Sequence, residues 1–147
     1  MENRCITYRQ AVAEDLKAIA GIDDSTHRHW TFEQFSHDFT LPYSRTVVAQ
    51  NSEGIAGFIV IWFLPPEVQI LNIAVDPAYR RRGVARHLLG HALTSLPASE
   101  PLSVIIEVRE GNTPARRFYS SLGFRQISMR RAYYGDEDAI VLQGRYP

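Results

Sequence analysis

The sequence contains a single cysteine, Cys5, a single lysine, Lys17, and no long apolar run. One cysteine excludes an intrachain disulfide, so packing in the core is the expected state of Cys5. No apolar stretch reaches the roughly 18 residues that a membrane helix requires, and the first residues lack the apolar segment of a signal peptide. We therefore expect a soluble, cytoplasmic protein without a membrane partner.

The chain also lacks net charge, because its formal charge at pH 7 is +0. Proteins that bind nucleic acid through bulk charge usually carry a basic excess, so we expect no nucleic-acid partner. The arginines are nevertheless clustered, which favours a local anionic partner. The two clusters are Arg80, Arg81, Arg82 and Arg86, and then Arg116, Arg117, Arg125, Arg130 and Arg131.

The length of 147 residues, with 45% hydrophobic and 22% charged residues, predicts one globular domain over residues 1–147. Helices are expected at 13–22, from Thr31, at 84–96 and at 113–122. Strands are expected at 5–9, 45–49, 55–64, 68–75, 102–108, 124–132 and 139–146. The strand–helix–strand order over 68–108 predicts a right-handed parallel crossover, and the whole predicts an α/β (α+β) fold with a central mixed sheet flanked by helices.

Two helix starts carry recognisable capping residues. Thr31 and Gln34 form the pattern of a capping box. Thr113 is expected to cap the last helix, with Pro114 at its first position and Gly123 ending it. The nearly continuous apolar run 102–108 predicts a buried strand, interrupted by Glu107.

A turn that joins a strand to a helix, Arg80-x-x-Gly83-x-Ala85, carries the main functional signal. Gly83 allows backbone conformations closed to other residues, and the amides of a helix N-terminus bind anions. The turn is not a P-loop, because the Lys and Ser/Thr of that motif are absent, and it is not a G-x-G-x-x-G motif. The alternative is an exposed basic turn that only begins a helix.

The segment Ile73-Ala74-Val75-Asp76-Pro77-x-Tyr79-Arg80-Arg81-Arg82-Gly83-Val84-Ala85-Arg86 resembles the coenzyme-A motif of the GNAT N-acetyltransferase superfamily. A second segment, Ile106-Glu107-Val108-Arg109-x-x-Asn112 followed by Phe118-Tyr119-x-x-Leu122-Gly123-Phe124, is similar to bacterial ribosomal-protein-alanine N-acetyltransferases. Trp30-Thr31-x-x-x-Phe35 resembles their early segment, although His29 replaces the usual proline. The resemblance implies a GNAT fold, acetyl-CoA as cosubstrate, and the N-terminal α-amine of a protein, such as a ribosomal protein, as acceptor.

The resemblance also implies which residues bind the cofactor. Backbone groups of Ile73, Ala74 and Val75 would hold the pantetheine arm as an added strand. Asn112 would bond the cofactor, with ordinary turn chemistry as an alternative that can coexist. The diphosphate would bind the turn, at Arg81, Arg82, Gly83, Val84, Ala85 and Arg86.

The implied reaction moves an acetyl group from a thioester to an amine. Glu107 is the candidate base, because a carboxylate inside an apolar strand is expected to be buried and burial would strengthen it as a proton acceptor. An ion pair with Arg109 or a strand-end charge is the alternative. Tyr119 is the candidate acid, since a phenol can donate to the leaving thiolate; its alternative is a core aromatic.

Trp30, Tyr133 and Tyr134 are candidate acceptor-binding residues, and the two tyrosines have packing at a hairpin end as their alternative. His87 and His91 stand one helical turn apart, but no glutamate lies between them, and we expect no metal. Two other functions stay open at this point. They are a small-molecule amine acetyltransferase on the same fold and a coenzyme-A-binding module without catalysis.

Overall fold

The computed structural model describes residues 5–24, 30–133, 135 and 137–146. His29 and Tyr134, both singled out in the sequence, lie outside the described residues. The chain contains strands, α-helices and short 3-10 helices (η). They are β1 Thr7–Gln10, η1 Ala13–Asp15, α1 Leu16–Asp24, α2 Phe32–Phe39, β2 Ser44–Asn51, β3 Gly54–Leu64, β4 Glu67–Val75, η2 Pro77–Tyr79, α3 Val84–Thr94, β5 Leu102–Arg109, α4 Thr113–Ser121, β6 Arg125–Arg130 and β7 Ala139–Tyr146.

The strands follow the hydrogen-bonded order β1-β2-β3-β4-β5-β7-β6. β4 and β5 pair in parallel, whereas β1–β2, β2–β3, β5–β7 and β6–β7 are antiparallel. The predicted mixed α/β fold and its parallel step from β4 to β5 are therefore confirmed. The chain forms two compact units, Met1–Phe63 with Leu71–Leu96 and Leu64–Ile70 with Pro97–Pro147. The single domain over 1–147 stays a prediction.

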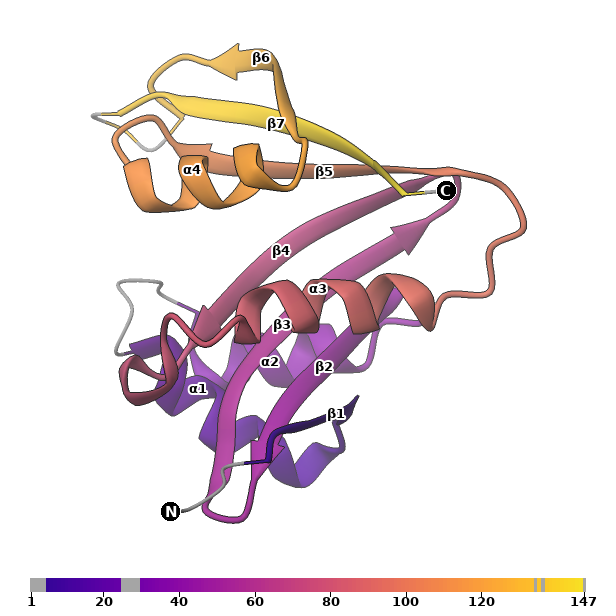
Figure 1. The fold of residues 1–147 in the computed structure, drawn as a ribbon, viewed down its shortest axis with the longest axis vertical. Helices are drawn as coiled ribbons and strands as arrows, with labels where there is room; N and C mark the ends of the chain where they lie inside the picture. The colour runs from indigo at the N-terminus through magenta and orange to yellow at the C-terminus, as the bar shows by residue number, and fades with distance from the viewer. Residues whose placement is uncertain (1–4, 25–29, 134, 136, 147) are drawn as a thin grey trace. The chain divides into compact units, whose positions relative to one another are not determined.

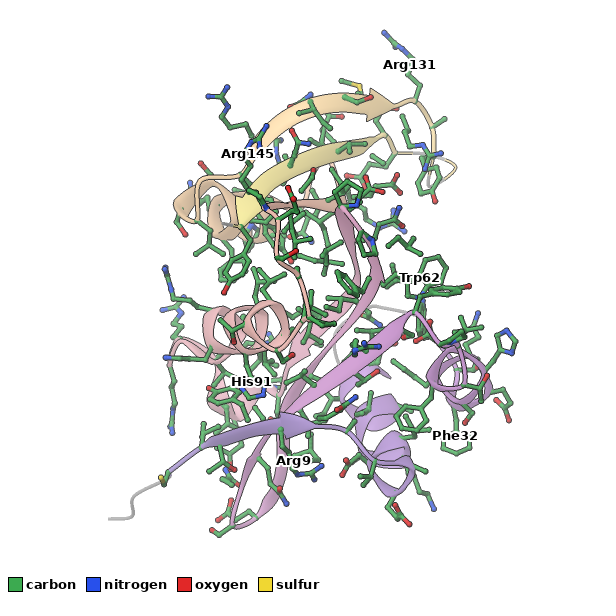
Figure 2. All side chains as sticks on the ribbon, turned by 90° about the vertical axis from the view of Figure 1, so that its right-hand side faces the viewer. Arg9, Phe32, Trp62, His91, Arg131 and Arg145 are labelled. Atoms are coloured by element: carbon green, nitrogen blue, oxygen red, sulfur yellow. The ribbon has the colours of Figure 1, made fainter. Side chains whose placement is uncertain are left out.

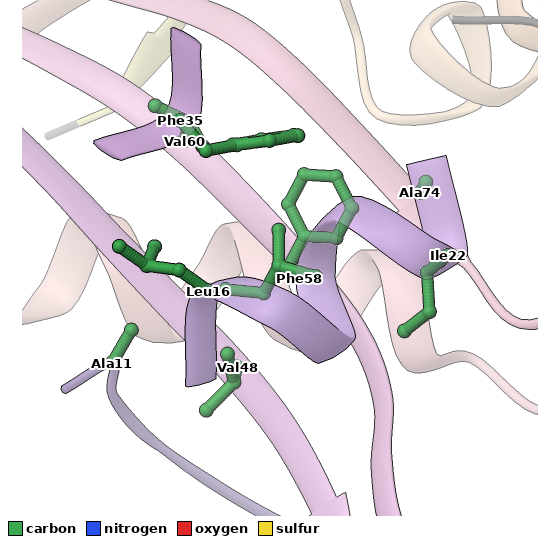
Figure 3. Close-up of a cluster of buried hydrophobic side chains, with 9 residues drawn as sticks. Ala11, Leu16, Ile22, Phe35, Val48, Phe58, Val60 and Ala74 are labelled. Carbon is green, nitrogen blue, oxygen red and sulfur yellow. The ribbon is translucent and has the colours of Figure 1, made fainter. Parts of the chain in front are cut away.

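In the first unit, helices cover both faces of the strands. Helices α1 and α2 lie on one face of β2 and β3, and α3 lies on the other face, where it packs on β1 and β2 (Figure 1). The core beneath α1 and α2 is a cluster of apolar side chains in which the ring of Phe35 stands edge-on to that of Phe58, with centroids 5.5 Å apart (Figure 3). Its members are Ala11, Leu16, Ile19, Ile22, Phe35, Val48, Phe58, Val60 and Ala74.

The start of α2 has the predicted capping box. Thr31 Oγ1 accepts from the Gln34 amide at 3.1 Å, and Gln34 Oε1 accepts from the Thr31 amide at 2.7 Å. Further along the helix, Asp38 accepts hydrogen bonds from the Trp62 indole of β3 at 2.8 Å and from Ser44 Oγ of β2 at 2.5 Å. Figure 2 shows Trp62 at the end of its strand beside α2, with Phe32 on the outside of that helix. Capping and side-chain bonds thus hold α2 against the strands.

An ion pair joins β1 to the end of η1, directly before α1. Arg9 donates to both carboxylate oxygens of Asp15, at 2.8 and 3.0 Å, and the Val12 amide donates to the same carboxylate at 2.8 Å. Only 8% of Asp15 is exposed. The hydrogen bond from Arg9 lowers the pKa of the Asp15 carboxyl group, and the Val12 amide adds to the shift.

An Asp15→Asn substitution should lower the free energy of unfolding at pH 7 by about 1 kcal/mol, because it removes a charge-assisted bond to a partly exposed arginine. The folded-state pKa lies below the unfolded value of about 3.9, so the contribution is present above that pH and is lost as the pH falls through the folded pKa. Urea unfolding at pH 7 and below pH 3 tests this. The exposed Glu14→Gln variant is the control, and a difference that persists in acid would contradict the assignment.

In the second unit, β5 pairs with Glu67–Ile70 of β4 on one side and with β7 on the other, and β6 follows β7. Burial along β5 alternates, so Leu102, Val104, Ile106 and Val108 are buried and the residues between them are partly exposed. The expectation of a strand buried throughout is therefore wrong. One face of β5 thus lies in the core, and the other, which carries Ser103, Ile105 and Glu107, is partly exposed.

The cap of helix α4 lies one residue earlier than the sequence suggests. Asn112, and not Thr113, is the N-cap, because its side chain accepts from the Ala115 amide at 3.2 Å. Thr113 is the first helical residue and Pro114 the second. The inner face carries the buried Tyr119, and Gly123, with φ +92°, ends the helix as predicted.

The one cysteine and the one lysine of the sequence both lie on the surface. Cys5 is exposed, so the expectation that it packs in the core is wrong. Lys17 is exposed on α1. Within the described part of the chain, every helix is too short or too polar to cross a membrane.

Candidate functional site

The turn between β4 and α3 has the backbone of an anion site. Gly83, the N-cap of α3, has φ +77° and ψ +13°, and Arg81 two residues earlier has φ +65°. The first amides of an α-helix have no acceptor within the helix, and Gly83 offers no side chain to bind them. These amides are therefore available to an anion, which the positive end of the helix also attracts.

Arginine side chains surround this turn. Arg81, Arg82 and Arg86 are exposed, and the Arg82 guanidinium lies 5.6 Å from the centre of the Tyr79 ring. Arg80 instead folds back, and its Nε donates to the Val75 carbonyl at 3.2 Å. The side chain of Val84 is only 2% exposed, so Val84 could contribute to an anion site through its backbone alone.

The strand before the turn is held closely on β3. A Cβ at Gly57 would lie 3.0 Å from the Ala74 carbonyl oxygen and 3.4 Å from Val75 Cα, so the two backbones approach without a side chain between them. The parallel register with β5 ends at Ile70, and among the described residues Ile73–Val75 are therefore paired along one edge only. A free strand edge leading to an anion-binding turn suits an extended amide chain that carries a diphosphate.

His87 also touches this turn. Its Nδ1 lies 2.8 Å from the Gly83 carbonyl oxygen, and the Tyr8 ring lies 5.6 Å from the His87 ring and 6.4 Å from that of His91. In the described part of the chain no group of three or more His, Cys, Asp or Glu side chains could hold a metal ion.

In the second unit, Glu107 forms an ion pair with Arg130. Arg130 of β6 donates to Glu107 Oε2 at 2.6 Å, and the Glu107 side chain is 30% exposed. The expectation that Glu107 is buried is therefore wrong, because it lies on the partly exposed face of β5. Arg109, considered above as its partner, bonds Glu137 at 3.3 Å.

The partner that the sequence did not reveal is Arg130. Its guanidinium also lies 4.6 Å from the centre of the Tyr133 ring, which is 50% exposed. Arg130 opposes Ala139 of β7, which opposes Arg109 of β5. Had β6 and β5 both been paired with β7 by counting residues from the β6–β7 turn, the sequence could have placed Arg130 near the end of β5. The structure thus joins Glu107, Arg130 and Tyr133 in one surface group.

The other candidates of the second unit are on α4. Tyr119 is 2% exposed, and its ring lies 4.9 Å from Phe118 and 5.1 Å from Phe124, as expected for a core aromatic. Asn112 uses its side-chain oxygen for the helix cap, so the turn-chemistry alternative is observed. Its amide nitrogen is the group that could reach a cofactor.

Trp30, the candidate acceptor residue of the first unit, is held by a buried pair. Its amide donates to Asp23 Oδ2 at 3.0 Å, and Asn72 Nδ2 donates to Asp23 Oδ1 at 3.1 Å. Asp23 is 0% exposed and Asn72 is 1% exposed. The sequence did not reveal this pair, although Asp23 falls at helical spacing from Leu16 and Ile19 and so on the apolar face of α1.

A mixed sheet with this parallel step, and a helix start with free amides after an open strand edge, is the arrangement expected of an acyltransferase that uses a coenzyme-A thioester. The model of the Acetyltransferase (GNAT) family matches residues 9–124. The chain belongs to this family and is an N-acetyltransferase that takes its acetyl group from acetyl-CoA.

Known proteins are similar over almost the whole chain. The "[Ribosomal protein bS18]-alanine N-acetyltransferase" of Escherichia coli K12 is 35% identical over 133 residues, covering 87% of this chain and 89% of that protein. The crystal structure of the ribosomal-protein-S18-alanine N-acetyltransferase from E. coli has a TM-score of 0.83 at 30% identity, covering 95% and 92% of the two chains. Ard1 from Thermoplasma volcanium has a TM-score of 0.86 at 29% identity, covering 97% and 98%.

Proposed function

We propose that this N-acetyltransferase acts on the N-terminal α-amine of a protein, with a ribosomal protein that begins with alanine as the first candidate. The observation that carries the proposal is the similarity to the E. coli ribosomal-protein-alanine enzyme, which extends over most of both chains. The sequence around Glu107 and Tyr119 adds support, because it resembles the same enzymes and offers a carboxylate and a phenol, the two residue types that the reaction uses.

The chemistry of an α-amine suits the groups that the chain offers. An α-amine has a pKa of about 7.7–8.0 and is partly neutral near pH 7, whereas a lysine side chain has a pKa of about 10.4. Deprotonating the lysine therefore costs roughly 3.5 kcal/mol more. A partly exposed carboxylate held by an arginine can serve as the base for an α-amine.

In the proposed reaction acetyl-CoA supplies an acetyl thioester. Glu107 accepts a proton from the amine as the amine nitrogen bonds to the carbonyl carbon and the carbon–sulfur bond breaks. Tyr119 donates its phenolic proton to the leaving sulfur.

The backbone of Ile73, Ala74 and Val75 would hold the pantetheine, and Asn112 would add a bond from its amide nitrogen. Arg81, Arg82, Gly83, Val84, Ala85 and Arg86 would hold the diphosphate, and Trp30 and Tyr133 would contact the acceptor.

Mass spectrometry on short peptides tests the acceptor. A peptide that begins with alanine and contains an internal lysine should gain one acetyl group at its α-amine when incubated with the protein and acetyl-CoA. The matched control is the same peptide with a formylated α-amine, which should gain none. Acetylation of the lysine in both peptides would contradict the proposal.

A panel of free amino acids, polyamines and aminoglycosides covers the small-molecule alternative. We expect a kcat/KM at least about tenfold lower on each of these amines than on the peptide, because a peptide offers more contacts to the acceptor side chains. A small amine that exceeds the peptide would replace the proposed acceptor class and leave the acetyltransferase activity itself standing.

A further inference from the structure

A fully buried carboxylate lies in the first unit, away from the candidate base. Asp23 is 0% exposed near the end of α1, and one oxygen accepts from the Trp30 amide and the other from the Asn72 side chain. We call Asp23, Asn72 and the Trp30 amide the Asp23–Asn72 bridge. It links the end of α1 to β4 and to Trp30, the residue that directly precedes the N-cap of α2.

The bridge includes several features that cost stability in the folded protein. An acidic group in the last turn of a helix opposes the helix dipole, and a buried carboxylate must recover the cost of leaving water. Asn72 lies on the face of β4 where the alternate residues Ile70 and Ala74 are buried and apolar. Among the described residues, none donates a hydrogen bond to Asn72 Oδ1. An apolar pair at these positions would avoid these costs, although it would take the Asp23 acceptor away from the Trp30 amide.

The bridge has a clear effect on position. Asn72 directly precedes Ile73–Val75, the strand edge assigned to the pantetheine, and Trp30 is the candidate acceptor residue. The hydrogen bond to Asp23 fixes the Trp30 backbone, and the Trp30 ring packs at 5.1 Å from Phe35, which is itself edge-on to Phe58. One buried carboxylate therefore sets the place of Trp30 relative to the strand that carries Ile73, within the same unit.

We infer that Asp23 and Asn72 are positioning residues for the acceptor: their bridge holds Trp30 in place beside the cofactor strand. This inference rests on the proposed role of Trp30 in acceptor binding. It predicts that breaking the bridge weakens the acceptor step and leaves acetyl-CoA binding intact, because no member of the bridge is among the residues proposed to hold the cofactor.

The test exchanges the two polar groups. Asn72→Asp alone places two carboxylates at hydrogen-bond distance, where like charges repel. We expect the Trp30 amide to exchange its hydrogen with solvent at least about tenfold faster, as followed by NMR, because its acceptor is displaced. The KM for the acceptor should rise by about tenfold or more, while the Kd for acetyl-CoA from calorimetry changes less than about twofold.

The double variant Asp23→Asn, Asn72→Asp restores a carboxylate–amide pair with the two partners exchanged. It should return both the exchange rate and the acceptor KM to within about threefold of the parent protein, which damage unrelated to the pair would not do. Asn51→Asp is the matched control, since Asn51 is a second buried asparagine of the same unit, 7% exposed, whose oxygen bonds the Glu53 amide. It should leave the acceptor KM unchanged.

The outcomes separate the two proposals. An unchanged Trp30 exchange rate in Asn72→Asp, or no recovery in the double variant, overturns the bridge. Faster exchange with an unchanged acceptor KM overturns its role in positioning the acceptor. If the parent protein fails to acetylate peptides, the proposed acceptor is wrong, and the KM comparison is made with whichever amine of the panel is acetylated.

Discussion

Glu107→Gln is expected to lower kcat for acetyl transfer by about 10²–10³, equivalent to roughly 3–4 kcal/mol of activation free energy. The substitution keeps the size of the side chain and an oxygen that can accept from Arg130, so the surface group with Tyr133 can persist. It removes the negative charge, and with it the ability to take a proton from the amine and the ion-pair character of the Arg130 contact. The Kd for acetyl-CoA should therefore change less than about twofold.

Glu137→Gln provides a matched control in the same unit. Glu137 is also a partly exposed carboxylate in an ion pair, with a side chain 31% exposed against 30% for Glu107. Its partner is Arg109 and it has no proposed role in the reaction, so kcat should stay within about threefold. Equal activities of the Glu107→Gln and parent proteins would remove Glu107 as the base.

Gly83→Val is expected to weaken acetyl-CoA binding by about 10–100-fold. Gly83 has φ +77°, a conformation that is strained for a β-branched residue by about 1–3 kcal/mol. Relief of that strain would turn the first amides of α3 away from the diphosphate, and each lost bond to a charged group is worth about 1.5–3 kcal/mol. Isothermal titration of acetyl-CoA measures the effect directly.

Substitutions at two other glycines distinguish the effect of backbone strain from the loss of acetyl-CoA binding. Gly123 has φ +92°, and nothing lies within 4 Å of the position of an added Cβ, so Gly123→Val should lose similar stability and keep the Kd for acetyl-CoA. Gly90 lies inside α3 with open space where a methyl group would be added, so Gly90→Ala should raise the free energy of unfolding by about 0.5–1 kcal/mol. Equal loss of binding in Gly83→Val and Gly123→Val would show that the turn has no special role.

Local patterns make much of this fold predictable from the sequence. The capping box at Thr31 depends on residues three positions apart, and the apolar stripe of α3 from Val84 to Leu93 depends on helical spacing. Such signals lie within one element. The shift of the α4 cap from Thr113 to Asn112 is the one-residue uncertainty expected at helix ends.

The failures concern residues that meet across long stretches of chain. Glu107 and Arg130 are 23 positions apart, and Asp23 and Asn72 are 49 positions apart. The face of β5 that carries Glu107 depends on its pairing with β7, since a strand with nearly all residues apolar has no alternation to reveal which side is exposed. The roles of Glu107, Tyr119 and the residues of the turn stay predictions that the variants above can test.

Lys17 is exposed on α1, and this enzyme therefore offers one lysine side chain to uncatalysed acetylation by its own cosubstrate. Thioesters acylate free amines slowly without any catalyst, and most proteins offer many lysines to that side reaction. Here Lys17 is the one side-chain amine open to that reaction, because the sequence has no other lysine. A Lys17→Arg variant would keep the charge and make any N-acetyl group found on the protein itself traceable to its own α-amine.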